Sequence, residues 1–334
     1  MKRSALVFVG PRRVDVVEEE IGPPPAGHVL ERTRVSAVSA GTELLVYRGE
    51  LAFDRPLDES LPALAGVPFA YPLRYGYAAV GDVIAVGAGV PEARLGRRVF
   101  ALAPHASAFA AAEADVFEVP AALDAERAAL FASMETAVNL ALDGAPRLGA
   151  RVAVLGQGVV GLLVTSLLAR FPLEALVAVE TDAARAKAAR ALGAHVVAPS
   201  VAEARAALGD GGVDLTFEIT GDPRALDAAL AITGREGRVV VGSFYGTKRA
   251  SVDLGAHFHR GRLTIASCQV SALPPELAAR WDRARRRRVA WDALARLDAS
   301  ALVSHRFSLG RAAEAYARLD AGPSSALQVL LTYE

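Results

Sequence analysis

The sequence predicts an α/β protein of two domains, one with a mostly antiparallel, barrel-like sheet and one with a doubly wound parallel sheet. Three observations support this: a length of 334 residues, a change of pattern near Asp124, and a glycine motif directly after an apolar strand. One hydrophobic core rarely serves so long a chain, so two domains are expected. A composition of 52% hydrophobic and 22% charged residues is that of a globular protein.

The first 120 residues have the pattern of short strands joined by Gly and Pro turns, such as Pro23–Pro25 and Gly87–Gly89. Strands and turns at this spacing are typical of an antiparallel, barrel-like domain. The segment Leu51–Pro72 is expected to be a long irregular loop, a kind of segment that often serves a site. The strands predicted in this part are Ala5–Val9, Arg13–Glu18, His28–Ser36, Gly81–Val86 and Arg98–Leu102.

From about Asp124, short apolar runs alternate with Ala-rich segments of helical period. Six apolar strands arranged in this way are expected to be parallel and buried on both faces. The predicted strands are Val152–Leu155, Ala175–Glu180, His195–Ala198, Asp214–Ile219, Arg238–Gly242 and Leu263–Ser267. The predicted helices are Gly158–Arg170, Ala183–Leu192, Val201–Leu208 and Pro223–Ile232.

The C-terminal part reverts to mixed helix and strand and ends in a predicted strand, Leu327–Thr332, which is able to rejoin the first domain. We therefore expect one domain over residues 134–268 and the other over residues 1–133 and 269–334.

Charge and cysteine content exclude several classes of protein. The 37 basic and 37 acidic residues balance, so no nucleic-acid partner is expected. The run Arg280–Arg288 is interpreted as a solvated helix face, the alternative being a patch for an acidic partner or nucleic acid. A single cysteine, Cys268, allows neither a disulfide framework nor a Cys-rich zinc site.

Apolar segments give no sign of a membrane protein. The run Ala5–Val9 is too short for a signal peptide, and Val159–Ala169 is about half of a membrane span. We expect a cytoplasmic protein with a small-molecule substrate.

The strongest motif is Gly156-Gln157-Gly158-Val159-Val160-Gly161, which follows a predicted strand and opens a predicted helix. This context is that of the Rossmann dinucleotide-binding fingerprint. Gly156 allows a tight turn, Gly158 lets the backbone approach a diphosphate, and Gly161 lets helix and strand pack closely. The amide groups and the dipole of the helix N-terminus then favour the phosphates.

Further cofactor contacts are expected at the ends of neighbouring strands. Glu180 lies 19 residues after Gly161, where a carboxylate binds the adenosine ribose and repels a 2′-phosphate, so NAD is favoured over NADP. Thr220-Gly221 and Gly242-Ser243 follow later strands and are expected to border the nicotinamide half. The alternatives are a surface carboxylate at residue 180 and ordinary turns at the other two places.

Beyond these motifs, the chain resembles the medium-chain dehydrogenase/reductase superfamily, the zinc alcohol dehydrogenase-like proteins. The resemblance rests on Ala40–Glu43, Gly76–Gly81, the late Rossmann motif and the stretch from Phe307 to Tyr316. It implies a GroES-like catalytic domain split around the coenzyme domain, hydride transfer in the cleft between these two domains, and a homodimer. The stretches Ser39–Glu43 and Ser267–Ser271 are most similar to the branch around bacteriochlorophyllide a dehydrogenase.

The zinc ligands of that family are missing from this sequence. The first zinc cysteine falls on Ala40, the His-Glu pair on Tyr77 and Ala78, and the later cysteine near Ala132, and the four-cysteine structural zinc lobe is absent too. Zinc needs three or four N, S or O ligands in fixed geometry. We therefore predict no bound metal.

Without zinc, hydrogen-bond donors must stabilise the reacting oxygen. The resemblance places Thr42 where the family has a Ser or Thr that bonds this oxygen, Tyr77 at a vacated ligand position, and His105 near the wall of the substrate pocket. The alternatives are that Thr42 caps the following helix, that Tyr77 fills the volume of the metal, and that His105 is a loop residue bonded to backbone.

The leading hypothesis is a zinc-independent, NAD(H)-dependent oxidoreductase acting on a secondary alcohol or ketone. A second is a zinc-free reductase of activated C=C bonds in quinones or enones, although those relatives generally prefer NADPH, which Glu180 opposes. A third is a nucleotide-binding protein without activity, because a fold does not guarantee chemistry.

Overall fold

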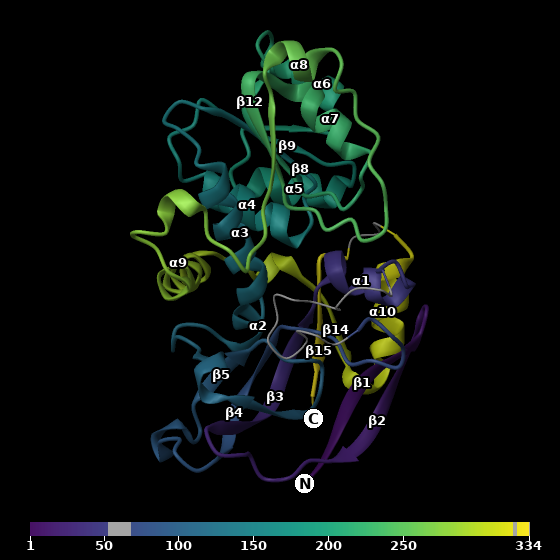
Figure 1. Cartoon of the computed structure of the whole chain (residues 1–334), viewed down its shortest axis with the longest axis vertical. Coiled ribbons are helices and arrows are strands. Elements are labelled where there is room, and N and C mark those ends of the chain that lie inside the picture. Colours follow the sequence, from purple (N-terminus) through teal and green to yellow (C-terminus); the bar gives the residue numbers. More distant parts are fainter. Residues whose placement is uncertain (53–67, 323–325, 334) are drawn as a thin grey trace. The chain divides into compact units, whose positions relative to one another are not determined.

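The computed structural model describes residues 1–52, 68–322 and 326–333, with the side chain of Ser300 left out. The chain forms two compact units (Figure 1). Unit 1 comprises Met1–Ala132 and Asp298–Glu334, and unit 2 comprises Ser133–Leu297. The chain thus returns to the first unit at Asp298, later than the expected residue 269. Most of the expected loop Leu51–Pro72 lies outside the described residues.

Unit 1 is built around a seven-stranded sheet and a separate two-stranded sheet. Its strands are β1 (Lys2–Gly10), β2 (Arg13–Glu20), β3 (His28–Val38), β4 (Ala79–Val86), β5 (Arg98–Ala101), β6 (Ala108–Ala112), β7 (Val116–Glu118), β14 (Val303–Ser308) and β15 (Gln328–Thr332). Its helices are α1 (Ala40–Arg48), α2 (Ala125–Ala128) and α10 (Ala312–Asp320).

The large sheet of unit 1 is mostly antiparallel. Its order is β14-β15-β3-β4-β5-β7, with β6 on β3, and within it only the pairing of β14 with β15 is parallel. Strand β15 lies between β14 and β3, so the chain end returns to the first domain as expected.

The core of unit 1 gathers around Tyr316 on α10. The Tyr316 ring stacks on Tyr47 of α1, with centroids 5.3 Å apart, and meets the edge of Phe8 of β1 at 5.2 Å. All three rings are buried, and aromatic pairs in such arrangements add to the stability that apolar burial provides. The core therefore ties the C-terminal segment to the N-terminal strands.

A buried carboxyl group in this sheet lacks a hydrogen-bond partner. Glu31 of β3 is fully buried, and neither of its carboxylate oxygens has a partner among the described residues. Gly81 of β4 makes room for it, because a Cβ there would lie 2.7 Å from Glu31 Oε1. Burial, and then the nearby Asp82 carboxylate, hold the pKa of Glu31 well above its usual value.

This buried acid is expected to make stability depend on pH. Because the pKa of Glu31 is raised by folding, its contribution is complete below about pH 4.3 and is lost as pH rises towards the folded-state value. Relative to Glu31→Gln, wild type should lose up to about 1.4 kcal/mol of unfolding free energy per pH unit in that range. Urea unfolding between pH 4 and 8 measures the difference. Glu18→Gln, on an exposed residue of β2, is the control, and parallel pH profiles for wild type and Glu31→Gln would contradict the prediction.

Unit 2 contains a six-stranded sheet in which every pairing is parallel, together with the helices of the teal and green part of the chain (Figure 1). Its strands are β8 (Arg151–Leu155), β9 (Ala175–Val179), β10 (Val196–Ala198), β11 (Val213–Glu218), β12 (Thr233–Val241) and β13 (Thr264–Ser267). Its helices are α3 (Phe131–Gly144), in which the boundary with unit 1 falls, α4 (Val159–Leu168), α5 (Ala183–Ala191), α6 (Val201–Leu208), α7 (Ala225–Ile232), α8 (His257–Gly261) and α9 (Arg283–Arg296).

The strand order β10-β9-β8-β11-β12-β13 is that of a doubly wound sheet, so the predicted fold class is confirmed. The order reverses between β8 and β11. In such sheets, ligands bind outside the carboxyl ends of the strands at this point. The glycine motif, Glu180, Thr220 and Ser243 all lie just beyond those carboxyl ends.

Candidate functional site

The three glycines of the motif lie in the turn between β8 and α4 and have three different surroundings. Gly156 has φ +89°, and a Cβ there would lie 2.9 Å from the Ile219 carbonyl oxygen. A Cβ on Gly161 would lie 1.9 Å from the Gly156 carbonyl oxygen. At Gly158, by contrast, nothing described lies within 4 Å of the Cβ position. The first and third glycines therefore allow close packing, whereas the second leaves open space.

That open space adjoins the N-terminus of α4. Gly158 is the N-cap residue and supplies no capping side chain, and the Leu162 N–H is bonded to the Gly158 carbonyl. The amides of Val159, Val160 and Gly161 precede Leu162, so they have no carbonyl four residues back within the helix. Amides and a helix dipole at an open position form a cradle for a diphosphate.

Gln157, which the sequence places in the cofactor loop, is buried with its side chain inside unit 2. Its Nε2 donates to the Val154 carbonyl at 3.1 Å, and its Oε1 accepts from Thr165 Oγ1 at 2.9 Å. The side chain thus ties the loop to β8 and α4. The structure gives Gln157 a role in shaping the loop.

Glu180 follows β9 directly and is bonded to the same loop. Its Oε2 accepts from the Gln157 backbone N–H at 2.8 Å, and its Oε1 accepts from the Asp182 N–H at 2.9 Å. The Thr181 hydroxyl also donates to Oε1 at 3.4 Å, so about one of the four hydrogen bonds that a carboxylate accepts remains for a ribose hydroxyl. The alternative of a plain surface carboxylate does not describe these contacts.

The turns after β11 and β12 are bonded to each other. The Gly221 N–H donates to Ser243 Oγ at 2.9 Å, which joins the two turns that the sequence predicts beside the nicotinamide. A Cβ at Gly242 would lie 2.8 Å from Leu140 Cδ2 of α3, so a larger residue at this position would clash with that helix. The Thr220 backbone N–H donates to Glu218 Oε1 at 2.8 Å, and this bond fixes the position of Thr220.

Glu218 and Tyr245 are two residues at this edge that sequence reasoning missed. Glu218 is fully buried at the end of β11 and accepts from the backbone and hydroxyl of Thr220 and from the Tyr245 hydroxyl. Burial and the Glu218 carboxylate raise the pKa of Tyr245 above its usual value. The available signal was a charged residue at the carboxyl end of a predicted strand of the parallel sheet.

In unit 1, Thr42 lies in the first turn of α1 and is half-buried. The N-cap residue is Ser39, and the Thr42 N–H donates to the Ser39 carbonyl at 3.1 Å, so Thr42 does not cap the helix. Among the described residues, none hydrogen-bonds the Thr42 hydroxyl. This group is therefore able to bond a ligand.

Tyr77 is half-buried, and its hydroxyl donates to Ser39 Oγ. Ser39, which was not among the predicted site residues, thus connects Tyr77 to the start of the helix that carries Thr42. The phenol of Tyr77 therefore has a defined hydrogen-bond partner in unit 1.

His105 is fully buried, and both of its ring nitrogens are bonded to side chains. Nδ1 lies 2.7 Å from Ser36 Oγ, and Nε2 lies 2.9 Å from Glu43 Oε2. Glu43 also accepts from the Tyr316 hydroxyl and, at 2.7 Å, from the Ser39 N–H. With both nitrogens occupied, His105 is placed to hold other residues rather than to contact a substrate.

The residues at the family's zinc positions do not fit a zinc ion. Ala40 and Ala78 carry no ligand atom, and the one heteroatom of Tyr77 is bonded to Ser39. In the described part of the chain, no group of three His, Cys, Asp or Glu residues could hold a metal. Within those same ranges, no helix is long and apolar enough to cross a membrane.

Comparisons with known proteins agree with the fold. The zinc-binding dehydrogenase family model matches residues 159–285. (R,R)-butanediol dehydrogenase of Bacillus subtilis is 28% identical over 78% of this chain and 80% of its own length. A 2-desacetyl-2-hydroxyethyl bacteriochlorophyllide A dehydrogenase of Cereibacter sphaeroides is 26% identical over 80% of this chain and 82% of its own.

Among solved structures, a 2R,3R-butanediol dehydrogenase from Bacillus subtilis has a TM-score of 0.80 at 22% identity, with 99% of each chain covered. A short chain alcohol dehydrogenase from Escherichia coli, crystallised with NADH, has the same TM-score at 20% identity and the same coverage. The protein is an oxidoreductase of the NAD(P)-dependent type. These comparisons agree with the resemblance to the medium-chain dehydrogenase/reductase superfamily that the sequence carries.

Proposed function

We propose that the protein is an NAD(H)-dependent oxidoreductase that transfers hydride between nicotinamide and a secondary alcohol or ketone without zinc. The observation that carries this proposal is the pairing of an open glycine position with a carboxylate on the same loop. Gly158 leaves space beside the α4 amides, and Glu180 is bonded to the loop at Gln157.

The residues of unit 2 fit a nicotinamide dinucleotide. Val159, Val160 and Gly161 would hold the diphosphate through their amides, and Glu180 would accept hydrogen bonds from the adenosine ribose. The linked turns at Thr220-Gly221 and Gly242-Ser243 would border the nicotinamide. When bound, nicotinamide supplies the hydride acceptor or donor, and these side chains bind and orient it.

The preference for NAD over NADP follows from charge. The Glu180 carboxylate would repel a 2′-phosphate, so NADH should bind at least about tenfold more tightly than NADPH, or about 1.4 kcal/mol. Fluorescence titration of the purified protein with both cofactors tests the proposal. A preference for NADPH, or binding of neither, would overturn it.

Relatives support a hydroxyl-bearing substrate, since they are named as dehydrogenases of butanediol, sorbitol and a guloside. With no ligands at the zinc positions, the reacting oxygen has to be stabilised by hydrogen-bond donors. We assign this role to the hydroxyl of Thr42, which has no hydrogen-bond partner among the described residues, and to Tyr77, whose phenol would exchange its bond to Ser39 for one to the substrate oxygen. His105 and Glu43 hold the start of α1 in place.

Thr42→Ala and Tyr77→Phe are each expected to lower kcat about 100-fold with little change in the affinity for NADH, because each removes a donor used in the transition state. Steady-state kinetics with secondary alcohols and NAD measure the effect. Tyr47→Phe, on a buried residue of the core cluster, is the matched control. Unchanged turnover in both variants would show that the assignment is wrong.

The same assays separate the alternatives. Turnover of enones or quinones but not of alcohols would favour the C=C reductase, and NADH binding without turnover would favour a nucleotide-binding protein. Enzymatic activity that remains after the protein has been treated with a metal chelator would support zinc independence.

A homodimer stays a prediction, and light scattering is the measurement that tests it. Strand β13, at the edge of the sheet, carries the exposed Ile265.

A further inference from the structure

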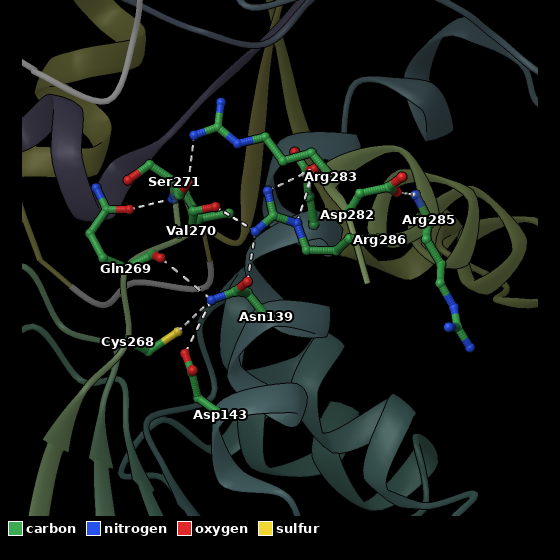
Figure 2. A network of polar contacts seen from close by, with 11 residues as sticks. Asn139, Asp143, Cys268, Gln269, Val270, Ser271, Asp282, Arg283, Arg285 and Arg286 are labelled. Atoms are coloured by element: carbon green, nitrogen blue, oxygen red, sulfur yellow. Dashed lines mark hydrogen bonds and ion pairs between the residues drawn. The ribbon is translucent and has the colours of Figure 1, made fainter. Parts of the chain in front are cut away.

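The segment that follows β13, residues 268–271, is fixed by a polar network that is not part of the glycine loop (Figure 2). Strand β13 is the sixth strand of the sheet and lies beside β12. Glu180 lies on the β9 side of the switch point, so the adenosine half of a dinucleotide belongs there and the nicotinamide half belongs over β11, β12 and β13. Residues 268–271 therefore lie on the nicotinamide side.

Arg286 of α9 is the centre of the network. It is only 3% exposed, although the sequence suggests a solvated arginine run. Its Nη2 and Nε donate to Glu135 Oε1 of α3 at 3.0 and 3.2 Å. Its Nη1 donates to the Val270 carbonyl at 2.5 Å and to Asn139 Oδ1 at 2.6 Å. A buried guanidinium with this many partners fixes the groups around it.

Asn139 of α3 continues the network and is fully buried. Because its Oδ1 accepts from Arg286, its amide nitrogen is turned towards β13. Nδ2 lies 3.3 Å from Cys268 Sγ, 3.5 Å from the Gln269 carbonyl oxygen and 3.1 Å from Asp143 Oδ2. Figure 2 shows Asn139 between the Arg286 guanidinium and the end of the strand.

Cys268 takes part as a thiol. Burial raises the pKa of Cys268, and so does the Asp143 carboxylate, with which the thiol forms a hydrogen bond. The thiol therefore stays protonated. A thiol held in this way is a hydrogen-bonding group and not a nucleophile. Its role is to fix the first residue after β13.

We propose that Asn139 and Arg286 are positioning residues that hold the backbone of residues 268–271 in the shape that binds the nicotinamide half of the cofactor. The inference rests on the proposed function. The two side chains bind the carbonyls of Gln269 and Val270 and the sulfur of Cys268. Asn139 lies on α3 and Arg286 lies on α9, so two helices fix this segment.

The test compares NADH with ADP-ribose, which has the same adenosine and diphosphate but no nicotinamide. In Asn139→Leu, which keeps the side-chain volume but loses the amide, the Kd for NADH should rise about tenfold, the effect of losing a buried hydrogen bond. The Kd for ADP-ribose should change less than about twofold. Arg288→Ala, on an exposed residue of α9, is the control and should bind both ligands as wild type does.

Two outcomes overturn the inference. Equal losses for NADH and ADP-ribose would mean a general structural role, and unchanged binding of both would mean no role. Either would leave the proposed function intact, which fails only if wild type binds no NADH. Should Asn139→Leu not fold, Arg286→Lys gives the same comparison, because lysine keeps the charge beside Glu135 but lacks the fork that reaches Val270 and Asn139.

Discussion

Replacing Gly158 with valine is expected to weaken NADH binding strongly and to leave the melting temperature of the protein unchanged. Gly158 has φ −69°, a conformation that every residue adopts, and nothing described lies within 4 Å of its Cβ position. The Cβ of a valine therefore meets no described atom, and its side chain is expected to occupy the space beside the α4 amides. A loss of about 100-fold in affinity, or about 2.7 kcal/mol, is expected from titration with NADH.

Gly161→Ala is the matched comparison, because it is expected to lower the stability of the protein, whereas Gly158→Val is expected to leave it unchanged. A Cβ at this position would lie 1.9 Å from the Gly156 carbonyl, so the backbone has to move and stability falls by about 1–3 kcal/mol. Thermal unfolding of both variants measures the contrast. Wild-type affinity for NADH in Gly158→Val would show that the diphosphate does not bind at this turn.

Removing the Glu43 carboxylate is expected to cause the largest loss of stability in unit 1. Glu43→Ala leaves His105 Nε2, the Tyr316 hydroxyl and the Ser39 N–H without their acceptor in a buried place. Uncompensated buried polar groups of this kind cost about 3 kcal/mol or more. Urea unfolding monitored by circular dichroism is the measurement.

Glu18→Ala, on an exposed residue of β2, is the control for this experiment. Glu43→Gln should recover part of the loss, because its amide oxygen is able to accept from the Ser39 N–H. If Glu43→Ala unfolded at the same urea concentration as wild type, the network around His105 would contribute nothing to stability.

The fold of unit 2 and the place of its cofactor loop were predictable because their signals are local. A glycine motif between a strand and a helix, and a carboxylate at the next strand end, need only short stretches of sequence. The return of the chain end to unit 1 was also predictable, from the strand pattern of the last residues.

The roles of Arg286 and His105 were not predictable, because their partners are far apart in the sequence. Glu135 precedes Arg286 by 151 residues, and Tyr316 follows Glu43 by 273. A run of arginines has the same pattern whether one of its members is buried or all are solvated. The buried Gln157 side chain is bonded to Thr165, which lies eight residues further along the chain.

The hydrogen bond between Glu180 and the Gln157 backbone has a consequence for redesign of coenzyme specificity. Under the proposed function, the Glu180 side chain would discriminate against a phosphorylated ribose, and it also holds the backbone of the turn proposed to bind the diphosphate. Exchanging it for a neutral or basic residue would admit the phosphorylated coenzyme and at the same time loosen that grip. A variant built to use NADPH therefore needs a second acceptor for the Gln157 amide, supplied from elsewhere in the turn.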